Sequence, residues 1–528
     1  MLSQQDPPGD PDRETARQTD PPTARPQRPV RTPLADLAAW LGTVAPDAAT
    51  RGDLSGVEVT GVTLSSQRVE PGDLYAALPG ARAHGIDFAA TAVGAGAVAV
   101  LTDPAGAERA PGPPGLPLLV VDDPRGVLGR LAARVHGDPA TSLRMIGVTG
   151  TQGKTTTTRL AEGGLQQAGV TAAVVGTVGT RVDGTDVRTT LTTPEAPDLH
   201  GLFAMMRERG VAACAMEVSS HALVMGRVDG VVFDVAVFLN LGRDHLDFHR
   251  DLEDYYAAKA SLFTPERARL ALVNVDDEHG RRLAAETELP VRTFSLTGRE
   301  ADWQAVDVEQ HPAGSHFVVI APDGTAIEAM VPLPGDFNVA NALAAIAACA
   351  EAGFDPARVA AGIATGGGVP GRLEQVDAGQ DFLVVVDYAH KPDAVEAALR
   401  TLRPLTDGRL LVVLGAGGDR DPGKRPIMGE IAARLADVLV VTDDNPRSED
   451  PAEIRAAMVA GAAGGPESRA EVIEVGDRRE AIRTALGRAT AGDIVLIAGK
   501  GHETGQEVAG VVHPFDDRTV AREELVRR

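Results

Sequence analysis

Cysteine is almost absent from this 528-residue chain, since only Cys214 and Cys349 occur and both lie inside apolar runs. Two such residues support neither a disulfide framework nor a cysteine-based metal site. The chain also has no run of about 18 apolar residues, and its N-terminus lacks the apolar core of a signal peptide. These absences predict a cytoplasmic protein with no membrane span.

Basic residues are few relative to acidic ones. The chain has 51 Lys and Arg against 74 Asp and Glu, and its formal net charge is -23. This balance disfavours nucleic acid and anionic membranes as general partners. An anionic substrate would need a locally basic pocket.

Lysine and asparagine are also scarce. The lysines are Lys154, Lys259, Lys391, Lys424 and Lys500, and the asparagines are Asn240, Asn274, Asn338, Asn341 and Asn445. Because these side chains supply chemistry that Arg and Asp do not, each one is a candidate for a specific role. The alternative is that codon bias makes lysine and asparagine rare and that the remaining ones stand at their positions by chance.

The length predicts several domains, because one hydrophobic core stops growing at roughly 250 to 300 residues. Residues 1–32 are rich in Pro, Gln, Arg, Asp and Thr, which predicts a disordered tail. Residues 33–138 alternate short β-like runs with Ala-rich stretches and predict a small α/β domain, and residues 139–368 predict a longer one. In residues 369–528, four apolar strands alternate with helical segments, as in a doubly wound sheet with its ligand crevice at the strand carboxyl ends.

The strongest local signal is GVTGTQGKTTTT at residues 147–158, where an apolar strand runs into a Gly-rich turn and a Thr-rich helix start. Its glycines let the backbone approach phosphates, Lys154 adds a positive charge, and the Thr155 hydroxyl can bind Mg²⁺. A strict P-loop would have glycine where Val148 stands. A plain Gly-rich turn is the alternative.

Further candidates follow along the chain. Glu217 ends an apolar strand, where a nucleotide-binding sheet holds a carboxylate for Mg²⁺, although a solvent-facing glutamate is the alternative. The spacing of His245, Asp247 and His249 also fits a zinc or iron hydrolase. Lys259 lies in a probable helix and, taken alone, is equally well a surface lysine.

Eleven motifs between residues 149 and 503 resemble, in order, those of the Mur ligase family. They are TGTQGKTTTT, TTPE, MEVSSHAL, NLGRDHLDFH, YYAAKASLF, LPGDFNVANALAA, PGRLEQV, VDYAHKPDA, GAGGDRDPGKRP, TDDNPR and AGKGHE. Within the family they are most similar to the ligases that add meso-diaminopimelate. The resemblance implies an α/β chain of three domains, with a central P-loop ATPase domain and a Rossmann-like C-terminal domain.

The resemblance also implies an activity: ATP-dependent addition of meso-diaminopimelate to the D-glutamate γ-carboxylate of UDP-N-acetylmuramoyl-L-alanyl-D-glutamate, through an acyl phosphate, in peptidoglycan synthesis. The first domain would hold the UDP end of this substrate. Residues that match the UDP-substrate contacts are Leu64, Ser66, Thr192, Thr193, Ser219 and Arg227. Gln67 and Met225 depart from the family pattern at this site.

For ATP and Mg²⁺, the resemblance implies a phosphate loop in the central domain. The matching residues are Gly150, Thr151, Gln152, Gly153, Lys154, Thr155, Thr156, Asn338 and Arg372. Thr155, Glu217 and His245 would serve Mg²⁺. Lys259 matches a lysine carried as a carbamate, which turns a cation into an anion able to hold a second Mg²⁺. Lys154, Lys259, Glu217 and His245 are the implied catalytic residues.

The resemblance places the incoming amino acid in the third domain. The matching residues are Arg420, Asp444, Asn445, Pro446, Arg447, Gly499 and Glu503, while Gly505 stands where an aromatic residue is common. A Mur ligase that adds L-lysine and a folate-polyglutamating ligase are the near alternatives. A GTPase would need an Asn-Lys pair, which the chain lacks, and LGAGGDR lacks the full dinucleotide-binding spacing.

Overall fold

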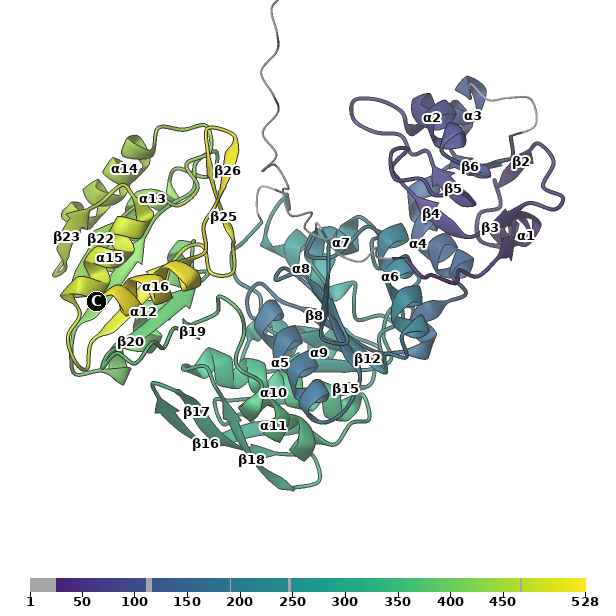
Figure 1. The fold of residues 1–528 in the computed structure, drawn as a ribbon. Coiled ribbons are helices and arrows are strands. Elements are labelled where there is room, and N and C mark those ends of the chain that lie inside the picture. Colours follow the sequence, from purple (N-terminus) through teal and green to yellow (C-terminus); the bar gives the residue numbers. More distant parts are fainter. Residues whose placement is uncertain (1–24, 111–115, 190, 246–247, 466–467) are drawn as a thin grey trace, which may run out of the picture.

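Three β-sheets follow one another along the chain in this computed structural model, and helices pack against each. The structure describes residues 25–110, 116–189, 191–245, 248–465 and 468–528. The first and third sheets lie on opposite sides of the central one (Figure 1). The predicted α/β class is therefore confirmed.

The first sheet has five strands in the order β2-β7-β6-β5-β4, parallel except for β2. Its strands are β2 (Ala49–Arg51), β4 (Gly61–Thr63), β5 (Asp73–Ala76), β6 (Ala99–Thr102) and β7 (Leu118–Val120). Its helices are α1 (Leu34–Val44), α2 (Ala89–Gly94), α3 (Pro104–Arg109) and α4 (Pro124–Val135). A separate short pair joins β1 (Thr32–Pro33) to β3 (Glu58–Val59).

The central sheet has eleven strands, with β8 between β12 and β13. In sheet order they are β11 (Thr185–Val187), β10 (Thr180–Val182), β9 (Ala172–Val175), β12 (Ala213–Glu217), β8 (Arg144–Thr149), β13 (Val235–Phe238), β14 (Ala271–Asn274), β15 (Val291–Ser295), β16 (Trp303–His311), β17 (Gly314–Ile320) and β18 (Ala326–Val331). The strands from β9 to β16 are parallel, so the loops after β8, β12 and β13 meet at one edge.

Helices cover both faces of this sheet, as its two separate buried clusters show. They are α5 (Lys154–Gln167), α6 (Ala196–Glu208), α7 (Ser220–Val224), α8 (Leu252–Ala260), α9 (Glu278–Glu286), α10 (Asp336–Glu351) and α11 (Pro356–Thr365). None of the helices in the described part of the chain has the length and apolar character that a bilayer crossing requires.

The third sheet has six strands, and its last parallel strand lies between the first two. In sheet order they are β19 (Glu374–Gln375), β20 (Leu383–Asp387), β24 (Ile494–Ala498), β21 (Leu410–Leu414), β22 (Val438–Val441) and β23 (Glu471–Glu474). The helices are α12 (Pro392–Leu402), α13 (Lys424–Leu435), α14 (Pro451–Gly464), α15 (Arg478–Arg488) and α16 (Asp517–Arg527), and a hairpin joins β25 (Gly505–Val508) to β26 (Val511–Pro514). The four apolar strands expected here are all present.

Several helices begin with the dipeptide Asp-Pro, at Asp103, Asp123, Asp355 and Asp450. In each case the aspartate side chain accepts a hydrogen bond from a backbone N–H of the first turn. Proline fits the first helical position because its N–H would have no partner there. This local sequence sets the start of four helices in three different parts of the chain.

Residues 25–32 were expected to be disordered, and the structure corrects this. Arg25 forms an ion pair with the buried carboxylate of Asp73 at 2.8 Å, and two backbone N–H groups of the segment bond to Glu208 of α6 at 2.7 and 3.0 Å. The composition argument failed because these contacts are polar and need no aliphatic side chains. The rest of the predicted tail, residues 1–24, lies outside the described residues, and the boundaries at 139 and 369 stay predictions.

Candidate active site

Two asparagines flank the Gly-rich turn between β8 and α5. Gly153 has φ +88°, and a Cβ atom there would lie 2.4 Å from Oδ1 of Asn341. Both the backbone angle and the space require glycine. On the other flank, Oδ1 of Asn240 accepts hydrogen bonds from the backbone N–H groups of Thr151 at 3.1 Å and Gln152 at 2.9 Å.

Lys154 lies at the start of α5. Its Nζ donates to the carbonyl oxygens of Gly150 at 2.7 Å and Thr151 at 3.1 Å. Burial lowers the pKa of Lys154, and the nearby Glu217 carboxylate opposes that shift. An anion in this loop would favour the charged amine, as expected for a phosphate-binding lysine.

Glu217, at the end of β12, is buried beside this helix. Its Oε1 accepts from the Thr155 hydroxyl at 2.9 Å and from the Thr177 N–H at 2.8 Å. A Cβ at Gly176 would lie 2.3 Å from the same oxygen, so glycine leaves the carboxylate its room. Hydroxyl and carboxylate oxygens are the donors that Mg²⁺ prefers, so the pair of Thr155 and Glu217 fits that ion.

Lys259 is not a surface lysine. It is 1 % exposed, its Nζ donates to the Gly150 carbonyl at 2.9 Å, and it lies 4.5 Å from the centre of the Tyr255 ring. Desolvation lowers the pKa of Lys259 well below its usual value, and the charge of Lys154 lowers it further. A neutral amine is the nucleophilic form of lysine, so this environment favours reaction with carbon dioxide.

His245 lies on the loop after β13, with its backbone in the left-handed region at φ +53°. Its ring is 4.9 Å from that of His221, and burial lowers the pKa of His245 to about 4, so the imidazole is neutral near pH 7. Among the described residues, no group of three His, Cys, Asp or Glu side chains is arranged to hold a metal ion. Asp247 of the zinc hypothesis lies outside the described residues.

Four residues predicted to contact the UDP-substrate gather beyond the end of β12. The hydroxyls of Thr192 and Thr177 are 3.1 Å apart, and Thr193 donates from its hydroxyl to the last carbonyl of β12 at 2.8 Å. The Ser219 N–H donates to the Thr193 hydroxyl at 3.3 Å, and Arg227 donates to the Thr193 carbonyl at 3.3 Å. The structure thus brings Thr192, Thr193, Ser219 and Arg227 together.

The two remaining residues of that set, Leu64 and Ser66, lie on the loop between β4 and β5. Leu64 packs against the core of the first sheet, and Ser66 is half-buried. An ion pair of 3.2 Å between Arg68 and Asp198 joins this loop to α6. The loop therefore faces the central sheet.

A buried polar cluster lies beyond the carboxyl ends of β22 and β24 in the third sheet. Lys500 is completely buried, and its Nζ is 2.9 Å from Oδ1 of Asn445 and 3.3 Å from Oδ1 of Asp444. Asn445 also donates to Glu503 at 3.0 Å. Three residues predicted to bind the amino acid are thus held together by a lysine that the prediction omitted.

Arginines extend this cluster toward the loop after β21. Arg447 has φ +52° and donates from Nη1 to the Gly418 carbonyl at 2.7 Å, with Glu507 3.4 Å from its Nε. Arg420 is exposed on the same loop. Gly499, at φ +119°, lies close to the Asp444 carboxylate. Pro446 separates Asn445 from Arg447 in the turn.

The remaining predicted ATP contacts, Asn338 and Arg372, are far apart in the chain. Asn338 is buried and donates to the Pro334 carbonyl at 2.8 Å, at the start of α10. Arg372 reaches Thr155 with Nη2 at 3.4 Å, and its guanidinium lies 4.9 Å from the Tyr388 ring centre. Of these two, the structure places Arg372 on the phosphate loop.

Comparison with known families matches nearly all of this architecture. Residues 58–136 match the Mur ligase family, catalytic domain; residues 148–349 match the Mur ligase middle domain; and residues 371–501 match the Mur ligase, glutamate ligase domain. The chain belongs to the Mur ligase family. The predicted three-domain Mur architecture is confirmed with it.

Individual relatives agree with this assignment. The chain is 58 % identical over 505 residues, which are 95 % of it and 98 % of the relative, to a UDP-N-acetylmuramoyl-L-alanyl-D-glutamate–2,6-diaminopimelate ligase of Streptomyces coelicolor. It is 51 % identical to the ligase of the same name from Corynebacterium glutamicum, over 89 % of this chain and 92 % of that one. A solved structure of such a ligase is 36 % identical with a TM-score of 0.66, covering 89 % and 95 % of the two chains.

In this Mur ligase, the C-terminal domain reaches the phosphate loop of the central domain. Besides the Arg372 contact, Lys391 holds both carboxylate oxygens of Asp244 at 2.7 Å. His502 interacts with the Thr177 backbone, and burial lowers the pKa of His502 to about 4. Arg372, Lys391 and His502 of the C-terminal domain thus contact the central domain at Thr155, Asp244 and Thr177.

Sequence reasoning missed several residues of this Mur ligase site, although scarcity had marked them. Asn240 bonds to the Gly-rich turn, Asn341 lies against Gly153, Lys391 joins two domains, and Lys500 joins the cluster of Asp444 and Asn445. Lys424 donates to the His390 carbonyl at 3.0 Å beside them. The low counts of Lys and Asn were therefore a usable signal.

Gly505, where the Mur pattern commonly has an aromatic residue, belongs to the β25–β26 hairpin. A Cβ at this position would lie 2.7 Å from Cγ1 of Val512 on the facing strand. The departure is therefore tied to the close pairing of this hairpin. Gln67 is exposed, and Met225 caps the end of α7, where its N–H donates to the His221 carbonyl at 2.9 Å.

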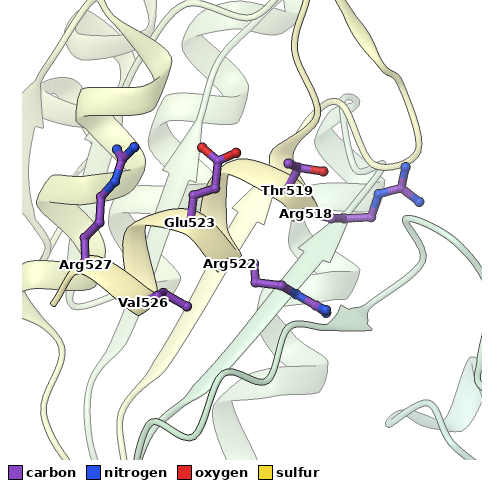
Figure 2. Close-up of a pocket in the computed structure, with 6 residues that line it drawn as sticks. All are labelled: Arg518, Thr519, Arg522, Glu523, Val526 and Arg527. Atoms are coloured by element: carbon purple, nitrogen blue, oxygen red, sulfur yellow. The ribbon is translucent and has the colours of Figure 1, made fainter.

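A hollow of about 460 Å³ lies along α16 (Figure 2). It is lined by Arg518, Thr519, Arg522, Glu523, Val526 and Arg527. Arg518 is already paired with Asp516, and Arg527 with Glu524. None of the predicted site residues lines it.

Proposed function

We propose that this Mur ligase joins meso-2,6-diaminopimelate to the D-glutamate γ-carboxylate of UDP-N-acetylmuramoyl-L-alanyl-D-glutamate, using ATP, in peptidoglycan synthesis in the cytoplasm. The observation that carries the proposal is the contact of the C-terminal domain with the phosphate loop region, through Arg372 and Thr155 at 3.4 Å and through Lys391 and Asp244 at 2.7 Å. Relatives whose names state this reaction, at 51 and 58 % identity, support it.

In the first step, an oxygen of the γ-carboxylate attacks the γ-phosphorus of ATP, and the bond to ADP breaks to leave an acyl phosphate. The amine nitrogen of diaminopimelate then attacks the acyl carbon, phosphate leaves, and the nitrogen loses a proton. Neither step requires a covalent bond to the chain. Positioning and charge neutralisation therefore dominate catalysis.

The chain's residues divide this work. The N–H groups and glycines of the loop at residues 150–156 bind the phosphates, with Lys154 and Arg372 supplying positive charge. Thr192, Thr193, Ser219 and Arg227 orient the muramoyl-dipeptide so that its carboxylate faces the γ-phosphate, while Leu64 and Ser66 hold the uridine. Asn338 contributes to the adenine site.

Magnesium would supply charge neutralisation between the phosphates and the acyl oxygen. Thr155, Glu217 and the neutral His245 would hold it, and Lys259 would join them as a carbamate. Carbamate formation consumes one carbon dioxide and releases one proton from the lysine nitrogen. The buried, neutral Lys259 amine suits that reaction.

Diaminopimelate would bind in the third-sheet cluster. Its far carboxylate would be held by the guanidinium groups of Arg447 and Arg420, and its ammonium group by Asp444 and Glu503, with Asn445, Pro446 and Gly499 shaping the turn. A lysine in this site would lack the far carboxylate and its charge-assisted hydrogen bonds to the guanidinium groups.

The test measures ATP-dependent phosphate release with the UDP-muramoyl-dipeptide and one amino acid at a time. Release with meso-diaminopimelate that greatly exceeds release with L-lysine is expected. Equal release with both would overturn the amino-acid assignment. Release that needs a folate and glutamate instead of the UDP-substrate would favour the folate-polyglutamating alternative.

A further inference from the structure

Three side chains form a hydrogen-bonded chain between α7 and α8. Nε2 of His249 is 2.9 Å from the hydroxyl of Ser220, and Nδ1 is 3.3 Å from Oδ2 of Asp254. Ser220 and His249 are each 2 % exposed. A buried imidazole with both nitrogens paired is fully satisfied, so this arrangement is specific.

The partners determine where the imidazole proton lies. Asp254 also pairs with Arg250 at 3.0 Å, and hydrogen bonds from Arg250 and then His249 hold the pKa of Asp254 below its usual range. An ionised carboxylate only accepts, so Nδ1 of His249 donates to Asp254. Nε2 pairs with the Ser220 hydroxyl on the other side of the ring.

Ser, His and Asp in this order are also the groups of a hydrolase triad. Here the Ser220 oxygen is enclosed at the first residue of α7, and its residue is 2 % exposed. A nucleophile must reach a carbonyl carbon from an open side, so the burial favours a positioning role.

The three hydrogen-bonded side chains join two parts of the proposed site. On one side, α7 has only five residues and needs outside contacts to stay in place, and Ser219, which caps it, is a predicted dipeptide contact. On the other side, the His249 ring lies 4.9 Å from the Tyr255 ring of α8. The Tyr255 hydroxyl is 3.3 Å from that of Thr151 in the phosphate loop, and Lys259 lies over the same ring.

We propose that His249 is a positioning residue that locks the dipeptide-binding turn at Ser219 and Ser220 to α8, the helix that presents Lys259 to the phosphate loop. This rests on the proposed function, because it assumes that Ser219 binds the dipeptide and that Lys259 acts as a carbamate. Without the hydrogen bonds of His249, the turn at Ser219 and Ser220 and the helix α8 both shift. Substrate affinity and carbamate stability then fall in the same variant.

The test compares His249→Phe, which fills the space without polar atoms, with His249→Gln, whose amide oxygen can still accept from Ser220. In His249→Phe we expect kcat/KM for the UDP-substrate to fall about 10- to 100-fold, the range for losing a buried hydrogen-bond partner. Its activity should rise with added bicarbonate, while that of the wild type stays constant. His249→Gln should recover part of the loss.

Two further variants keep the test decisive. Ser220→Ala removes one hydroxyl with little risk to folding, and its effect should largely vanish in the His249→Phe background. His200→Phe removes another buried imidazole, which is bonded to the Asp229 carbonyl of the same domain, and should change thermal stability without creating a bicarbonate response.

A His249→Phe enzyme with wild-type KM and no bicarbonate response would overturn the proposal, as would additive effects of Ser220→Ala and His249→Phe. Labelling of Ser220 by a fluorophosphonate would overturn it in favour of a hydrolase. A wild-type enzyme that releases no phosphate with the UDP-substrate and diaminopimelate would instead refute the proposed function. The two failures are thus distinguishable.

Discussion

At the scale of single residues, burial explains most of the chemistry assigned to the proposed site. Lys259 and Lys500 are both enclosed, but their partners differ. Lys259 meets a carbonyl, an aromatic ring and a second lysine, whereas Lys500 meets the carboxylate of Asp444 and the amide of Asn445. The first environment favours a neutral, reactive amine, whereas the second holds the Lys500 amine in place beside Asp444 and Asn445.

This difference predicts the behaviour of Lys259→Ala. We expect its turnover to fall by about 100-fold or more, because the carbamate oxygens beside Mg²⁺ are lost, and to recover partly with acetate or formate. Phosphate release at increasing carboxylate concentration measures the recovery. Lys259→Arg serves as the control, since it fills the space and should show no recovery. Wild-type turnover in unsupplemented Lys259→Ala would contradict the role.

Arg447 predicts amino-acid selectivity. Charge-assisted hydrogen bonds contribute about 1.5 to 3 kcal/mol each, so Arg447→Ala should lower kcat/KM for diaminopimelate by about ten- to a hundredfold and narrow its preference over L-lysine. Arg425, which braces the same region through Glu449 at 2.8 Å, is the matched control. Arg425→Ala should reduce stability and keep the preference. If Arg447→Ala keeps the wild-type preference for diaminopimelate over L-lysine, Arg447 only braces the turn.

Two buried histidines predict how stability depends on pH. Burial lowers the pKa of His136 to about 3 and that of His200 to about 4, below the ordinary value of 6.5. Between pH 4 and 6.5 the unfolded chain therefore binds more protons, and stability rises with pH by up to about 1.4 kcal/mol per unit for each histidine. Melting temperatures from pH 5 to 7 should rise, and His200→Phe should flatten the slope.

At the scale of elements, the sequence predicts the four inner strands of the third sheet but not its two edge strands. The four apolar strands of the last 160 residues could be located because continuous Val, Leu and Ile runs are typical of parallel strands buried on both faces. The short strands β19 and β23 escaped notice because they lie at the sheet edges and are partly polar. Their pairing depends on the sheet already being present.

The segment at residues 25–32 is the clearest error of composition-based reasoning. Deleting residues 2–24 should leave thermal stability nearly unchanged, whereas deleting residues 2–32 should cost about 1 to 3 kcal/mol, since it leaves the buried Asp73 carboxylate without its arginine. Differential scanning calorimetry of both variants would measure this. Arg25→Ala in the full chain measures the contribution of this ion pair alone. Equal stability of the two deletion variants would contradict a stabilising role of residues 25–32.

At the scale of the whole molecule, the sequence indicated the three domains but not their contacts. The motifs identified the family, and the family implied which residues share a cleft, yet the bond between Lys391 and Asp244 joins positions 147 residues apart on different sheets. No local pattern encodes such a pair. The same holds for Arg372 and Thr155, which are 217 residues apart.

The Lys391 contact predicts that domain closure depends on charge. Lys391→Ala should lower kcat by about tenfold, because a missing charged pair between the two domains weakens the closed arrangement, while nucleotide affinity stays close to that of the wild type. Small-angle scattering with nucleotide and substrate should show a wider average shape. Lys391→Arg should keep most of the activity. Wild-type kcat and scattering in Lys391→Ala would show that the pair is dispensable.

The placement of the lysines has a practical consequence. All five are bonded to residues of the proposed site or directly beside it, namely Gly150, Asp244, His390 or the Asp444 cluster. Lys259 and Lys500 are enclosed, whereas Lys391 is 44 % exposed. Acylating dyes, crosslinkers and acetyl donors that react with amines therefore find lysine side chains only in or beside the proposed site. Lysine labelling of this protein therefore reports the accessibility of the proposed site, and attachment to a surface through lysine would block that site.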